Sequence, residues 1–241
     1  GVQTCALPIL AKADSWIDMG VLEGALRDDL DAKAARTVGV LNPLKLIIDN
    51  YPEGHSETCT APVHPHHPER GNRSFPISRE LWIEEEDFME VPTKGYFRLF
   101  PGNMVRLRYG YVVKCTGCEK DANGNVTVVH CEYLPETKSG TPGADSVKVK
   151  GNLHWVSAAQ SCAAEIRLFD RLFQVPAPGA RRAGDAPEVE RDFLDDLNPA
   201  SKQTITAQLE PCLRDVKPEE RFQFERHGYF VADRVDSRDG K

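Results

Sequence analysis

The chain has 241 residues, of which 40% are hydrophobic, and its formal net charge is −7. This length is sufficient for one or two domains with substantial cores. No apolar run approaches the ~20 residues of a membrane span, and no segment resembles a signal peptide. The seven cysteines lack the dense spacing of a secreted scaffold, so we expect free thiols in a cytoplasmic protein.

The first nine residues, GVQTCALPI, contain no Met and show no hydrophobic periodicity. One choice of codons for them spells a common sequencing-library adapter. We therefore expect 1–9 to be a non-native leader and the chain to be a fragment. A helix of about 15 residues should follow, with Ser15 as its N-cap and Asp18 imitating a capping box. Its apolar positions recur at helical spacing, at Met19, Leu22, Leu26 and Leu30.

From residue 38 onward, short β-rich runs alternate with clusters of Gly, Pro, Asn and Asp. This pattern predicts barrels or sandwiches of antiparallel strands. The clearest element is a hairpin over 111–133, because its Asn123-Gly124 pair is the strongest short turn signal. Segments 134–145 and 177–190 are rich in Pro and Gly and predict exposed loops. Further strands are predicted at 38–40, 44–48, 81–83, 96–99, 104–108, 147–156, 165–173, 203–208, 221–226 and 229–233.

The charge pattern is most unusual in KGYFRLFPGNMVRLRYGYVVK, residues 94–114, which holds five basic residues and no acid. Guanidinium groups beside aromatic rings suit unstacked RNA bases, which offer both hydrogen-bonding edges and stacking faces. The alternative is the solvated face of an amphipathic pair of strands. By contrast, the acidic run EEEDFME at 84–90 predicts a solvated turn.

Residues suited to catalysis are missing from the sequence. The chain has no Gly-rich phosphate-binding motif and no strand–helix alternation that would build a parallel nucleotide-binding sheet. No carboxylate pair has an apolar, Gly-rich context that would raise a pKa, and Ser157 lacks the turn of a hydrolase nucleophile. We therefore predict no catalytic residue.

The best metal candidate is Cys115-x-x-Cys118, which faces His130 and Cys131 across the predicted hairpin. A complete four-ligand site usually has a second short-spaced pair, which is missing. The alternative is that Cys115 and Cys131 are small apolar residues packed across paired strands. We predict no metal site here.

A second cluster, His64, His66 and His67, alternates with prolines that hold the segment extended. We expect a surface loop, with His66 near RNA.

Seven blocks of sequence stand out: RTVGVLNPLKLIIDNYPEG (36–54), FPISRELWIEEEDF (75–88), KGYFRLFPGNMVRLRYGYVVKCTG (94–117), KVKGNLHWVSA (148–158), AEIRLFDRLFQVPAPG (164–179), DFLDDLNPAS (192–201) and FQFERHGYF (222–230). In this order they resemble the C-terminal, anticodon-binding half of glutaminyl-tRNA synthetase, a class I aminoacyl-tRNA synthetase. The resemblance implies a mainly β fold of two antiparallel β-barrels, preceded by a short α-helical connector.

The resemblance also implies a division of the chain. Residues 10–37 would form the connector, 38–145 the first strand-rich block and 146–241 the second. The last strand that normally closes the proximal barrel would be missing, which would leave an unpaired strand edge.

In this family the two barrels grip the anticodon loop of glutamine tRNA, whose anticodon has a central U and a final G, and unstack its bases. A bidentate Arg suits G, and Gln or Arg suits the carbonyls of U. The resemblance therefore implies contacts to anticodon bases or adjacent phosphates from Arg36, Arg98, Arg106, Arg108, Gln223 and Arg226. Further RNA contacts are expected from His66, which replaces an Asn of the family, and from Lys94.

The family attaches glutamine to its tRNA with ATP and Mg in a catalytic domain that carries His-x-Gly-His and Lys-Met-Ser-Lys-Ser-like motifs. Neither motif is present, so we expect a glutamine–tRNA ligase as the parent protein and no activity or cofactor in this chain. The parent is expected to be a monomer without a membrane or DNA partner.

Two alternatives remain open. One is the archaeal and eukaryotic kind of glutamyl-tRNA synthetase, whose C-terminal half shares these barrels; Gln223 within FQFERHGYF favours the glutamine enzyme. The other is a stand-alone RNA-binding β-barrel, which LRDDLDAKAARTVGV, residues 26–40, argues against.

Overall fold

The computed structural model describes residues 17–180 and 191–237. The chain separates into two compact units, one ending at Ala34 and one beginning at Ala35. The described part is mainly β and contains one α-helix, near its N-terminus, which confirms the predicted fold class at this level. No helix in these described ranges is both long and apolar enough to cross a membrane.

The helix of the first unit, α1, covers Met19–Lys33 and has the predicted length of 15 residues. Its N-cap is Asp18, whose Oδ1 accepts a hydrogen bond from the Gly20 N–H at 2.7 Å. The predicted cap at Ser15 is therefore wrong, and Ser15 lies outside the described residues. Aspartate caps as well as serine does, and here its side chain satisfies a first-turn donor.

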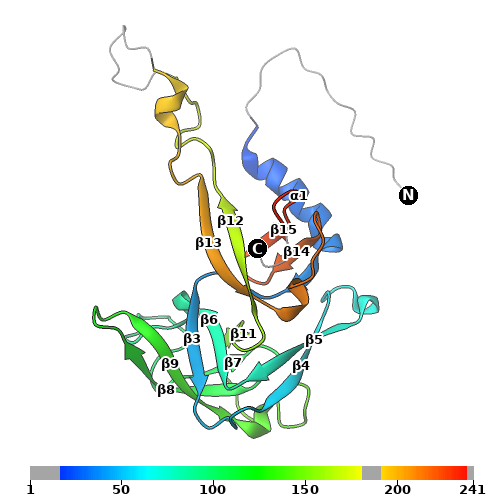
Figure 1. Ribbon diagram of the computed structural model, residues 1–241, viewed down its shortest axis with the longest axis vertical. Coiled ribbons are helices and arrows are strands. Elements are labelled where there is room, and N and C mark those ends of the chain that lie inside the picture. Colours follow the sequence, from blue (N-terminus) through cyan, green and yellow to red (C-terminus); the bar gives the residue numbers. More distant parts are fainter. Residues whose placement is uncertain (1–16, 181–190, 238–241) are drawn as a thin grey trace. The chain divides into compact units, whose positions relative to one another are not determined.

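The largest sheet of the second unit has seven strands in the order β10-β7-β8-β9-β3-β6-β11 and curls on itself (Figure 1). Alternate residues of its strands point inward, as Leu44, Leu46 and Ile48 of β3 do, and form a core around Trp155. The strands are β3 (Pro43–Ile48), β6 (Glu80–Glu84), β7 (Met104–Leu107), β8 (Val112–Lys120), β9 (Val126–Leu134), β10 (Gly151–Leu153) and β11 (Val156–Ser157).

The predicted hairpin is confirmed as β8 and β9, which pair antiparallel. Gly124 of its turn has φ +87°, a conformation that glycine adopts without strain. Asp121 Oδ1 accepts the N–H groups of Asn123 and Asn125 and fixes the turn.

The strand pair β4 (Ser56–Pro62) and β5 (Asn72–Ser78) forms a separate antiparallel ribbon that the sequence patterns did not predict. Conversely, the strand predicted at 96–99 is missing, apart from an isolated bridge between Leu99 and Phe88. Segment 134–145 is a loop of exposed and half-buried residues, as predicted, except that Thr137 within it is fully buried.

Two smaller sheets join the start of this unit to its end. One has the order β12-β13-β2 and the other β1-β14-β15. Gly39 permits this closure, because a Cβ there would lie 2.8 Å from side-chain atoms of Leu209 and Phe224. The strands are β1 (Ala35–Thr37), β2 (Gly39–Val40), β12 (Cys162–Phe169), β13 (Lys202–Leu209), β14 (Arg221–Phe224) and β15 (Gly228–Val231).

The sequence predicted antiparallel pairing of all strands, and this is wrong for three pairs. The pairs β1–β14, β3–β9 and β7–β10 are parallel. Each joins strands separated by a long stretch of chain, which is what parallel pairing requires. Short 3₁₀ helices complete the described fold: η1 (Pro68–Arg70), η2 (Glu85–Asp87), η3 (Pro135–Thr137), η4 (Phe193–Asp196) and η5 (Pro211–Leu213).

Candidate nucleic-acid interface

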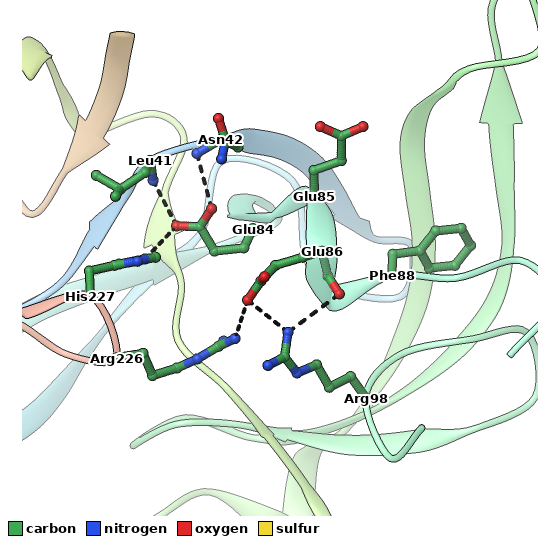
Figure 2. A pocket seen from close by; sticks show the side chains of 9 residues that line it. All are labelled: Leu41, Asn42, Glu84, Glu85, Glu86, Phe88, Arg98, Arg226 and His227. Carbon is green, nitrogen blue, oxygen red and sulfur yellow. Dashed lines mark hydrogen bonds and ion pairs between the residues drawn. The ribbon is translucent and has the colours of Figure 1, made fainter. Parts of the chain in front are cut away.

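A pocket of about 690 Å³ opens where four segments of the chain meet, within the unit that begins at Ala35 (Figure 2). The segments are the turn before β3, the end of β6 with η2, the segment before β7, and the turn between β14 and β15. Two of the lining residues, Arg98 and Arg226, are among the predicted anticodon-binding residues. The full lining consists of Leu41, Asn42, Glu84, Glu85, Glu86, Phe88, Arg98, Arg226 and His227.

Arg98 reaches the pocket from the segment before β7. The Leu99 N–H donates to the Asp87 carbonyl at 3.0 Å, which fixes Arg98 beside η2. Arg98 Nη1 donates to Glu86 Oε1 at 2.8 Å and lies 2.9 Å from Asp87 Oδ1. All of its polar contacts use Nη1, so Nε and Nη2 have no partner among residues 17–180 and 191–237. These two donors are available to a ligand.

Arg226 lies in the β14–β15 turn with φ +76°, an uncommon conformation for a residue other than glycine. Its Nη1 donates to both carboxylate oxygens of Asp87, at 3.0 and 2.7 Å, and its Nη2 donates to Glu86 Oε1 at 2.8 Å. Burial lowers the pKa of Arg226, but the hydrogen bonds to Asp87 raise it more, so its pKa lies above the ordinary value. Its donors therefore serve the protein before any ligand arrives.

The sequence predicted a solvated turn for the acidic run at 84–90, but part of this run is buried. Asp87 is fully buried and Glu84 is 1% exposed. Asp87 is compensated by the guanidinium groups of Arg98 and Arg226. Those partners lie 11 and 139 residues away along the chain, so local charge patterning gave no signal for them.

Glu84 is held by donors on several sides. Its carboxylate accepts N–H groups from Leu41 at 2.7 Å and Asn42 at 3.0 Å, and His227 Nε2 lies 2.8 Å from Oε1. Burial alone would raise the pKa of Glu84, but the hydrogen bonds from His154, His227 and the two backbone groups hold it well below its ordinary value. Glu84 therefore stays ionised beside the pocket.

Glu84, His154 and His227 also place their ligand atoms within 4.8 Å of one another, a group that could hold a metal ion. Arg226 Nη1 lies 3.1 Å from His154 Nδ1, and a guanidinium can only donate. The other ring nitrogen of His154, Nε2, lies 3.4 Å from Glu84 Oε1. Both ring nitrogens of His154 thus already have protein partners, and we assign the group as a hydrogen-bonded network.

Arg36 and Gln223 come together on adjacent strands. They are direct partners in the parallel register of β1 and β14. Gln223 Oε1 is buried and has no hydrogen-bond partner in the described part of the chain. A buried acceptor without a donor is costly, and it favours a ligand that supplies an N–H group.

Arg108, which directly follows β7, contacts the residue after β14. Its Nε forms an ion pair of 2.9 Å with Glu225 Oε2, without hydrogen-bond geometry, and its guanidinium lies 5.1 Å from the Tyr109 ring centroid. Glu225 follows β14 directly and also accepts from Arg73 at 3.2 Å. Of the predicted site residues, β14 and its turn thus bring together five: Arg36, Arg98, Arg108, Gln223 and Arg226.

Arg106 is held elsewhere. Its Nη1 donates to the Thr137 carbonyl at 2.9 Å, and its Nη2 donates to the Ala144 carbonyl. The guanidinium therefore holds the segment after β9, which contains the buried Thr137. Its predicted contact with RNA stays a prediction.

Lys94 and His66 are both exposed and neither lines the pocket. The cluster around His66 is not wholly a surface loop as predicted, because His64 is 1% exposed and packs edge-on against His67 at 4.6 Å between ring centroids. The His67 N–H donates to the His64 carbonyl at 3.2 Å, and this turn brings the two rings together.

The thiols described by the structure are free, as predicted. Cys115 and Cys131 are buried partners in the β8–β9 register, which agrees with the packed alternative for this pair. Among the described residues, the potential metal-ligating group is the Glu84–His154–His227 network and does not include Cys115, Cys118 or Cys131. Cys5 lies outside the described residues.

Comparisons with known proteins bear on the whole chain. Two family models, each described as the anticodon-binding domain of class I (E and Q) tRNA synthetases, match residues 34–134 and 152–233. The chain is 71% identical to glutamine–tRNA ligase of Cupriavidus metallidurans over 232 residues, 96% of this chain and 38% of the relative. The corresponding enzyme of Cupriavidus necator is 70% identical over the same shares. That of Ralstonia nicotianae is 66% identical over 96% of this chain and 39% of the relative.

Proposed function

This chain belongs to the anticodon-binding domain family of class I (E and Q) tRNA synthetases, and we propose that it reads the anticodon of glutamine tRNA within a glutamine–tRNA ligase. The convergence of the five predicted residues on β14 and its turn carries this proposal. The chain spans 38% of the length of the two Cupriavidus relatives, so the reaction itself is assigned to the remainder of the parent protein.

The family match supports a finer reading of the architecture. We propose that 38–145 and 146–241 are two barrel-like blocks, preceded in the sequence by a connector at 10–37. The bounds of the two blocks are similar to those of the matched segments, 34–134 and 152–233. Strands β1 and β2, which begin the unit, pair with β14 and β13 near its end. This closure would bring residues of both blocks to one RNA-binding surface.

The chemistry of the anticodon fits the side chains that meet at β14. Uracil presents one N–H between two carbonyls, and the buried Gln223 Oε1 would accept that N–H while Arg36 donates to a carbonyl. Guanine presents O6 and N7 as acceptors, and Arg98 has Nε and Nη2 available for them. The central U and the final G would therefore be read by different residues.

The parent protein would use ATP and Mg to activate glutamine outside this chain. We propose that it acts in the cytoplasm as a monomer, with tRNA rather than DNA or a membrane as its partner. The pocket offers carboxylate and guanidinium groups, which can bind and orient a ligand.

Binding of synthetic anticodon stem-loop RNA by the 241-residue chain tests this function. The stem-loop with the glutamine anticodon should bind more tightly than one with a substituted third base. Arg98→Ala should weaken cognate binding by about 1 to 3 kcal/mol and reduce the discrimination. Arg167→Ala is the matched control, because Arg167 pairs with Glu165 and Asp236 outside the pocket.

Equal binding of cognate and substituted stem-loops at physiological salt would overturn the proposal and leave a nonspecific RNA surface. Preference for the glutamate anticodon, which has C in place of the final G, would instead select the glutamyl-tRNA synthetase alternative.

A further inference from the structure

Glu86 occupies the centre of the pocket between the two guanidinium groups (Figure 2). Its Oε1 accepts from Arg98 Nη1 and from Arg226 Nη2, each at 2.8 Å. Its second oxygen, Oε2, makes no hydrogen bond to any residue that the structure describes. With its side chain 63% exposed, Glu86 presents this acceptor to a ligand.

The position of Glu86 is set by its neighbours. The 3₁₀ turn η2 covers Glu85–Asp87, and the buried Asp87 anchors it through Arg226. Arg98 Nη1 also lies 3.4 Å from the Glu86 carbonyl, so the two residues are held side by side. Glu86 and Arg98 are thus held in one ion pair, in which Glu86 keeps an open acceptor and Arg98 keeps open donors.

This order of groups matches one base. The Watson–Crick edge of guanine presents an acceptor, O6, followed by two donors, N1–H and the N2 amino group. A guanidinium donor beside a carboxylate, which can only accept, complements that edge. Adenine, cytosine and uracil each lack the adjacent pair of donors. The carboxylates around the pocket also disfavour a phosphate there, since like charges repel.

We propose that Glu86 is a specificity-determining residue that accepts hydrogen bonds from N1–H and the N2 amino group of the final anticodon guanine, while Arg98 donates to O6. This inference rests on the proposed anticodon-reading function and assigns to Glu86 a role that the sequence patterns did not predict. The competing explanation is that Glu86 merely supports the two arginines through an exposed ion pair, which contributes little.

Inosine separates these explanations, because it retains O6 and N1–H of guanine but lacks the N2 amino group. The experiment measures binding of anticodon stem-loops with guanine, inosine or adenine at the third anticodon position. Each is titrated against the unmodified chain, Glu86→Gln and Glu86→Ala. Glu85→Ala is the matched control: it removes the same charge from the adjacent position, whose exposed side chain is directed away from Glu86 in Figure 2.

The unmodified chain should bind the guanine stem-loop about tenfold more tightly than the inosine stem-loop, as expected for a lost hydrogen bond to a charged group. Glu86→Ala should bind guanine and inosine stem-loops equally, and Glu86→Gln should retain only part of the difference. Glu85→Ala should keep the full preference. Thermal unfolding of each variant checks that the fold is intact.

An unchanged preference for guanine over inosine in Glu86→Ala would overturn the role of Glu86 while leaving anticodon reading in place. A uniform gain in affinity for all three stem-loops would also overturn it, because Glu86 would then act only by repelling RNA. If the unmodified chain does not distinguish guanine from adenine, the proposed function fails together with this inference.

Discussion

Replacement of Arg226 by alanine tests whether this residue stabilises the fold by compensating the buried charge of Asp87. Asp87 is fully buried, and Arg226 supplies two of the hydrogen bonds that compensate its charge. Removing one partner of a buried ion pair typically costs about 3 to 5 kcal/mol. Because Arg226 is 25% exposed and Arg98 remains 2.9 Å from Asp87, we expect Arg226→Ala to lower the free energy of unfolding by about 2 to 3 kcal/mol, below that range.

Urea denaturation of single and double variants measures this effect. Arg98→Ala should cost about 1 kcal/mol or less, since Arg98 is 38% exposed and approaches the carboxylates through one nitrogen. Asp87→Asn combined with Arg226→Ala should cost less than the sum of the single changes, because the uncompensated charge is removed. Equal small losses of unfolding free energy for Arg226→Ala and Arg98→Ala would refute this stabilising role of Arg226. Additive losses in the double variant would also refute it.

Three further outcomes are expected. Gly151→Ala should destabilise the fold by about 1 to 3 kcal/mol in urea, because its Cβ would lie 2.3 Å from the Phe97 carbonyl oxygen, whereas Gly117→Ala, with open space around it, should be nearly neutral. Burial raises the pKa of Glu210 from 4.5 to about 7, so the folded state holds the proton more tightly than the unfolded state. Stability should therefore fall as pH rises across that interval. Glu210→Gln should flatten this part of the pH dependence of the urea midpoint. Lys94→Ala should weaken all stem-loops almost equally and reduce the salt slope of binding by about one counterion; a selective loss for the cognate anticodon would contradict this.

Elements with strong local signals could be predicted from the sequence. The β8–β9 hairpin follows from its Asn-Gly turn, and α1 follows from its apolar spacing. The ribbon of β4 and β5 was missed because both strands are rich in polar residues and contain proline, which is typical of edge strands. The strand predicted at 96–99 failed because turns with positive φ at Gly95 and Gly102 enclose it.

The candidate site could be predicted only in part. Family resemblance identified the basic residues, but it did not reveal which guanidinium groups are already bound within the protein. Arg106 is committed to the carbonyls of Thr137 and Ala144, contacts that depend on how the segment after β9 folds back. Glu86 gave no signal because its importance depends on Arg226, 140 residues later in the chain.

The charge balance of the pocket indicates that base recognition and attraction to the RNA backbone are carried by different residues. Arg98 and Arg226 each pair with the carboxylates of Glu86 and Asp87, so their positive charge is locally neutralised. A phosphate gains little at such a site, whereas a neutral base edge with both donors and acceptors can pair with both kinds of group. Attraction to the RNA backbone must then come from cations outside the pocket, such as Lys94. It follows that salt should govern the affinity for any RNA, while the difference between anticodons should persist as salt rises.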